Sequence, residues 1–146
     1  MEKIFVDAST VISGLLFRGK ESILLELGNL GALKLVINEY VLREVEAGLR
    51  KKIFGLTDEN CQRLTRYLLR CVSVASDPPK ESIKKYWGLL SDKEDLPVVV
   101  GAKEQNCDYL VTGDKEMLSE KVKRFVNSTT TSELLEKLIK EKFMRL

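Results

Sequence analysis

Two aspartates in this chain each follow a short run of strand-forming, apolar residues. Asp7 comes directly after residues 4–6 (IFV), and Asp114 follows residues 109–111 (YLV), with Thr112 and Gly113 between. In an open parallel sheet, ligands bind outside the carboxyl ends of the strands, at the point where the strand order reverses. The two carboxylates are 107 positions apart in the sequence, yet they can share one acidic cleft.

Two further acids can be placed by helical geometry. Glu44 lies three residues after Val41 and flanks the apolar stripe of its helix. Asp95 precedes Val98 and Val99 by three and four residues, which puts it at the amino-terminal end of a core-facing helix stripe. An acid on such a stripe is unusual unless something pairs with it. We therefore expect both side chains to lie at the same edge of the sheet as the two aspartates.

Each of the four acids also has an ordinary structural interpretation. An aspartate after a strand is a common N-cap of the next helix, which would account for Asp7, and Asp114 could cap the turn that follows it. Glu44 taken alone is typical of a solvated helix residue. Asp95 taken alone is typical of a first-turn acid favoured by the helix dipole. The functional interpretation depends on all four pointing to one edge of one sheet.

Four bare carboxylates in one cleft would raise one another's pKa values and destabilise the fold. Divalent cations relieve this repulsion, and an all-oxygen ligand set favours Mg²⁺ or Mn²⁺ over zinc or copper. The hydroxyls of Ser9 and Thr112 stand beside the acids, where they could orient a carboxylate or a metal-bound water. The chemistry that uses such a site is phosphoryl transfer to water.

The residue types that are missing exclude most competing mechanisms. The chain contains no histidine, so it cannot form a Ser-His-Asp or Cys-His triad or an H-E-x-x-H protease site. Its three cysteines, Cys61, Cys71 and Cys107, include no C-x-x-C pair, and we expect buried apolar thiols rather than disulfides or a zinc site.

Charge and hydropathy restrict the partners and the location. The 24 basic and 22 acidic residues give a net charge of +2, so any nucleic-acid contact must depend on local patches. No apolar run approaches the roughly 20 residues of a membrane span, and no secretory segment precedes the first strand. We therefore expect a cytoplasmic protein without membrane contact.

The chain alternates between strand and helix patterns, which predicts an α/β domain over residues 1–146 with a central, mostly parallel sheet of about five strands. Strands are expected at residues 4–6, 34–37, 71–74, 109–111 and 124–126. Helices are expected at residues 9–29 with a break near 17–19, at 39–49, 57–70, 80–90 and 95–105, and after a capping box at 130–133.

Four motifs together resemble the PIN-domain family and cover nearly the whole chain. They are VDAST at 6–10, YVLREV at 40–45, DKEDLPVVVGA at 92–102 and YLVTGDKEML at 109–118, of which the TGDKxxL string is the most specific. The general plan is similar to single-domain prokaryotic PIN proteins of the VapC type. The resemblance implies a three-layer, Rossmann-like ribonuclease fold that uses Mg²⁺ or Mn²⁺.

The resemblance also implies roles for individual residues and partners. Asp7, Glu44, Asp95 and Asp114 would be the catalytic, metal-binding acids, although Asp92 and Glu94 compete with Asp95 for the third position. Asp92 could also join through a second metal ion or a water. The family's further traits are cleavage of single-stranded RNA, frequent homodimers and inhibition by a small antitoxin protein.

Substrate contacts are less clear in the sequence. The run Arg50, Lys51 and Lys52 is the preferred phosphate contact, because it leaves the helix that carries Glu44. Such charge runs are more often solvated surface. Tyr86 and Trp87 could stack on bases, although core packing or a dimer interface is the commoner role for a lone tryptophan.

The main hypothesis is therefore a metal-dependent endoribonuclease, the toxin of a toxin–antitoxin pair. The alternative is a catalytically weak PIN-fold module that binds RNA or a protein partner. A phosphatase of the haloacid-dehalogenase type is disfavoured, because it needs an acid two residues after its nucleophilic aspartate, and here that position is Ser9.

Overall fold

The structure is a computed structural model that describes residues 1–144, so the last two residues of the expected domain lie outside it. Its strands are β1 (Lys3–Val6), β2 (Lys34–Asn38), β3 (Val72–Ala75), β4 (Tyr109–Val111) and β5 (Ser128–Thr129). Its α-helices are α1 (Ala8–Leu16), α2 (Lys20–Asn29), α3 (Glu39–Leu49), α4 (Asp58–Cys71), α5 (Lys80–Lys85), α6 (Leu96–Glu104), α7 (Glu120–Lys123) and α8 (Thr131–Met144). Two 3₁₀ turns, η1 (Lys52–Phe54) and η2 (Lys93–Asp95), complete the fold.

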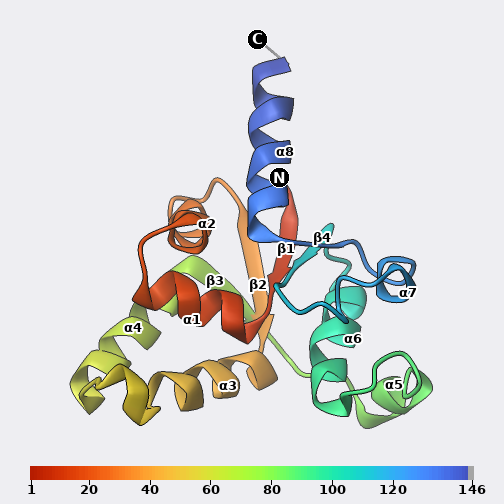
Figure 1. Ribbon diagram of the computed structural model, residues 1–146, viewed down its shortest axis with the longest axis horizontal. Helices are drawn as coiled ribbons and strands as arrows, with labels where there is room; N and C mark the ends of the chain where they lie inside the picture. The colour runs from red at the N-terminus through yellow and green to blue at the C-terminus, as the bar shows by residue number, and fades with distance from the viewer. Residues whose placement is uncertain (145–146) are drawn as a thin grey trace.

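The five strands form one sheet in the order β3-β2-β1-β4-β5, and every neighbouring pair is parallel. Helices α1, α2 and α4 lie on one side of the sheet and α5, α6 and α7 on the other, while α3 runs below the carboxyl ends of the strands (Figure 1). The expected three-layer α/β fold is thus confirmed. The strand order reverses between β1 and β4, since β2 and β3 lie on one side of β1 and β4 and β5 lie on the other.

Buried apolar side chains stabilise the central strands of this sheet. Apart from Lys3, the residues of the central strands β1 and β4 are buried and almost entirely apolar, as expected for a parallel sheet covered on both faces. Their register pairs Val6 with Val111, so Asp7 and Thr112 are the first residues beyond the ladder on adjacent strands. Cys61 and Cys71 are buried and free, as predicted, whereas Cys107 is free and half-buried.

Two sequence-based boundaries were wrong. The fifth strand is Ser128–Thr129 rather than residues 124–126, because the backbone N–H groups of Phe125 and Val126 both donate to the Val122 carbonyl at the end of α7 (2.8 and 2.9 Å). They are therefore not available to a sheet ladder. The helix expected at 80–90 ends at Lys85, and the chain then turns through Tyr86 and Gly88 towards η2.

The other helical boundaries agree with the sequence patterns to within one or two residues. Within residues 1–144, no helix is both long enough and apolar enough to cross a lipid bilayer. Helix α8 leaves the body of the molecule beyond the amino-terminal edge of the sheet, away from α3 and the carboxyl ends of the strands (Figure 1).

Candidate active site

Asp7 and Thr112 form the centre of the site, at the reversal point between β1 and β4. Asp7 is only 5% exposed and caps α1, because its Oδ1 accepts a hydrogen bond from the Thr10 backbone N–H (2.9 Å). The buried Thr112 hydroxyl donates to Asp7 Oδ2 (2.6 Å) and accepts from the Asp114 backbone N–H (3.1 Å). One hydroxyl thus joins the two strand-end aspartates.

Asp114 is exposed and is held by its own turn. Its Oδ1 accepts hydrogen bonds from the backbone N–H groups of Glu116 and Met117 (2.9 and 3.0 Å). The capping interpretations of Asp7 and Asp114 are therefore correct, and they do not compete with a functional one. Each carboxylate oxygen has two lone pairs, so an oxygen that accepts one hydrogen bond can still bind a cation.

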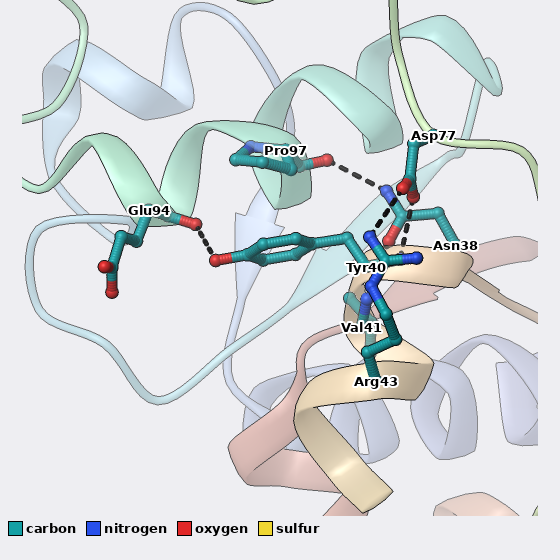
Figure 2. Close-up of polar contacts among 7 residues, drawn as sticks. All are labelled: Asn38, Tyr40, Val41, Arg43, Asp77, Glu94 and Pro97. Carbon is teal, nitrogen blue, oxygen red and sulfur yellow. Dashed lines mark hydrogen bonds and ion pairs between the residues drawn. The ribbon is translucent and has the colours of Figure 1, made fainter. Parts of the chain in front are cut away.

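Glu44 and Asp95 reach the site from helices on either side of it. Glu44 is exposed on α3, one turn after Tyr40, and Asp95 is half-buried where η2 passes into α6. The buried Asn38 joins these two helices: its Oδ1 caps α3 through the Val41 N–H, and its Nδ2 donates to the Pro97 carbonyl (both 3.0 Å) (Figure 2).

Tyr40 makes a second link between the same helices. Figure 2 shows its ring reaching across from α3, where its hydroxyl donates to the backbone carbonyl of Glu94 (2.6 Å). Asp77 fixes the start of α3 by accepting from the Tyr40 N–H (2.7 Å) and from Arg43 Nη2 (2.9 Å). Burial and the surrounding carboxylates, Glu44 first among them, raise the pKa of Tyr40 to about 12, so its hydroxyl remains a donor.

These elements enclose a cleft of about 340 Å³ at the carboxyl edge of the sheet. All four acids singled out in the sequence line it, and none of its lining residues is basic. The lining residues are Asp7, Ala8, Ser9, Glu44, Asp95, Val98, Gly113, Asp114 and Met117.

Burial, and then the clustering of negative charge, raises the pKa values of the two acids contributed by the helices. Desolvation, followed by repulsion from Asp92, Asp114, Glu44 and Asp7, raises the pKa of Asp95 to about 6. Desolvation and the carboxylates of Glu94, Asp7 and Asp92 likewise raise the pKa of Glu44. The site therefore holds carboxylates whose repulsion is not neutralised by cationic side chains in its lining.

The donor set fits a hard divalent cation, because the cleft offers carboxylate and hydroxyl oxygens. As the side chains are placed, no group of three or more Asp, Glu, Cys or His residues within the described part of the chain is close enough to hold a metal ion. Binding a cation would therefore require some of these carboxylates to move closer together. Glu44 has room to do so, since its side chain is exposed.

Of the other expected site residues, Ser9 lies in the cleft lining, and Asp92, Arg50, Lys51 and Lys52 lie outside it. Asp92 is exposed and caps η2 by accepting from the Glu94 N–H (2.9 Å). Arg50 is six residues beyond Glu44, roughly 9 Å further along the helix, and it forms an ion pair with Asp58. The role of Arg50, Lys51 and Lys52 as phosphate contacts remains a prediction.

Sequence reasoning missed Tyr40 and the wall residues Val98 and Met117. Tyr40 stands four residues before Glu44, and this spacing is the only signal that it shares the helix face of an active-site acid. Its partner is a backbone carbonyl 54 positions away, for which a sequence carries no signature.

A family model described as PIN domain matches residues 3–116. The chain belongs to the PIN-domain family. PIN domains are generally nucleases and typically use divalent metal ions. No curated protein sequence matches the chain.

Three solved structures share this PIN fold. PAE2754 from Pyrobaculum aerophilum is 22% identical with a TM-score of 0.71, covering 94% of this chain and 90% of that one. VapBC2 from Rickettsia felis, bound to a DNA fragment from its promoter, is 18% identical with a TM-score of 0.62, covering 88% and 96%. A domain of a functionally unknown Methanocaldococcus jannaschii protein is 21% identical with a TM-score of 0.55, covering 89% and 91%.

The Thr112 bridge predicts a specific loss of stability. Thr112→Val keeps the shape of the side chain but leaves Asp7 Oδ2 and the Asp114 N–H without their partner. We expect the free energy of unfolding to fall by about 1–3 kcal/mol in urea denaturation without metal. Thr129→Val is the matched control, since that buried hydroxyl makes only 3.4 Å contacts. Equal losses in both variants would contradict the account.

The raised pKa of Asp95 predicts the sign of a pH effect. Because the folded value, about 6, exceeds the ordinary value of 3.8, stability from this group is complete at low pH and is lost as the pH rises through 6. Asp95→Asn should therefore stabilise the metal-free PIN domain at pH 7.5 by about 1–2 kcal/mol, allowing for solvent screening.

The gain from Asp95→Asn should disappear as the pH falls from 6 towards 4, and chemical denaturation in EDTA across this range measures it. Asp108→Asn is the control, because Asp108 lies before β4 at the opposite end of the strand and accepts from the Lys3 N–H (2.8 Å). A stabilisation that does not change with pH would show that carboxylate repulsion is not its cause.

Proposed function

We propose that this PIN domain is a divalent-metal-dependent endoribonuclease that hydrolyses phosphodiester bonds in single-stranded RNA, with Mg²⁺ or Mn²⁺ as its cofactor. The observation that carries the proposal is the convergence of Asp7, Glu44, Asp95 and Asp114, from four separate elements, on one cleft at the reversal point of the sheet. No basic side chain in the cleft lining balances these acids.

Each acid has a role that follows from its surroundings. Asp7, Asp95 and Asp114 would hold the metal, which when bound lowers the pKa of water and stabilises negative charge on the phosphate. Asp7 is the fixed member of the set, because Thr10 and Thr112 hold its two oxygens in place. Glu44, exposed on α3, would serve as a further ligand or orient the attacking water by accepting its hydrogen bond.

We further propose that the protein is the toxin of a toxin–antitoxin pair, a cytoplasmic homodimer inhibited by a small antitoxin. The structural similarity to VapBC2 from Rickettsia felis supports this proposal at the level of the fold.

A second candidate is a PIN-fold module that binds RNA or a protein partner with little turnover. The observation in its favour is that, within residues 1–144, no three acids are placed close enough together to hold a metal ion. Binding that survives neutralisation of the acids, without metal-dependent cleavage, would favour this candidate.

The deciding experiment is cleavage of single-stranded RNA with Mg²⁺ or Mn²⁺. Asp7→Asn and Asp114→Asn should each lower kcat/KM by at least about 100-fold, which is more than is usual when a residue that only supports a metal ligand is lost. EDTA should abolish activity. Asp108→Asn, at the other end of β4, should cleave like the wild type. Cleavage that survives the chelator or both substitutions would falsify the proposed mechanism.

A further inference from the structure

Trp87, the only tryptophan of the chain, lies on the surface. It is 53% exposed, so core packing is not its role. It follows α5 directly, in the turn that leads to η2 and Asp95. An exposed indole of this size leaves a large apolar face in contact with solvent.

Hydrogen bonds attach the turn around Trp87 to the loop that carries Asp114 and to α7, and the turn itself leads into η2 and Asp95. Ser91 donates through its backbone N–H and its hydroxyl to the Glu116 carboxylate (3.0 and 2.7 Å), and the Glu116 N–H donates to Asp114 (2.9 Å). Lys121 Nζ donates to the Gly88 carbonyl (2.8 Å). The turn that carries the indole is therefore joined to the loop of Asp114, which lines the cleft.

The two segments that these hydrogen bonds join carry an excess of positive charge. Residues 80–93 and 115–124 together carry eight basic and four acidic side chains, although the whole chain is only +2, so the remainder is net acidic. Lys93 Nζ lies 5.4 Å from the centre of the Trp87 ring and donates to the Trp87 and Leu90 carbonyls, which leaves one of its three N–H donors free. Lys121 is exposed.

We propose that Trp87, Lys93 and Lys121, here called the Trp87 patch, bind the single-stranded RNA substrate beside the cleft. A base stacks on the indole, and the two ammonium groups contact phosphates on either side of it. This inference rests on the proposed nuclease function and adds where the substrate lies.

Electrostatics supports this position for the substrate. A polyanion approaching the acidic cleft needs positive charge next to it, and the Trp87 patch provides that charge together with a stacking platform. The alternative run beginning at Arg50 offers no exposed aromatic ring of comparable size, and Arg50 is already paired with Asp58.

Trp87 makes the binding test direct, because it is the sole indole fluorophore. A short single-stranded RNA, titrated in EDTA to prevent turnover, should change Trp87 fluorescence saturably and less strongly as salt rises. An RNA duplex of the same sequence should have little effect. No change with the single strand, or an equal change with the duplex, would overturn the proposal.

Variants then separate this inference from the proposed function. Trp87→Ala should weaken binding of a labelled RNA, and raise KM, by roughly 5- to 150-fold with little change in kcat. Trp87→Phe should recover part of the loss, and Lys121→Gln should reduce the salt dependence of binding. Phe17→Ala is the control, because Phe17 is an exposed aromatic at the far end of α1.

If RNA is cleaved but Trp87→Ala keeps the wild-type KM, the Trp87 patch is excluded and the nuclease stands. If RNA binds and alters Trp87 fluorescence but is never cut, the nuclease fails and the patch stands. A fluorescence response to a protein partner but not to RNA would overturn the patch as a substrate site.

Discussion

Four carboxylates lie together at one edge of the parallel sheet, and the elements around them must hold them there against their mutual repulsion. The reversal of strand order between β1 and β4 creates the cleft, and the chain places acids on every wall of it. The fold must therefore hold the acids together at a cost that is visible in the pKa values of Asp95 and Glu44, which are raised by desolvation and then by repulsion from the neighbouring carboxylates. A site that bears this strain without an internal cation is suited to recruit one from solution.

Within the cleft, neutral side chains rather than basic ones hold the segments that carry the acids. Thr112 holds Asp7 and the Asp114 loop, while Asn38 and Tyr40 hold the helix of Glu44 against the segment that carries Asp95. Hydroxyl and amide groups fix geometry without cancelling the negative charge, which a basic side chain would do. The positive charge lies instead outside the cleft, on segments 80–93 and 115–124, where an anionic substrate would meet it.

Much of this arrangement could be predicted from the sequence, because it depends on the spacing of apolar residues along strands and helices. Strand runs that end in Asp7 and Asp114 predicted the edge they share, and the helix stripes around Val41 and Val98 predicted the sides from which Glu44 and Asp95 approach. The fifth strand was misplaced because capping of α7 consumes the N–H groups of Phe125 and Val126. The link from Tyr40 to Glu94 and the exposure of Trp87 depend on tertiary contacts that no local pattern encodes.

The proposal that the four acids form a metal site can be tested without substrate or turnover. The protein is titrated with Mn²⁺, and the electron paramagnetic resonance signal of the free ion is measured at each step. We expect saturable binding to the wild-type protein, at least about tenfold weaker binding to Asp114→Asn, and unchanged binding to Asp108→Asn. Equal Mn²⁺ affinity in the wild type and Asp114→Asn, or no binding to the wild type at millimolar Mn²⁺, would contradict it.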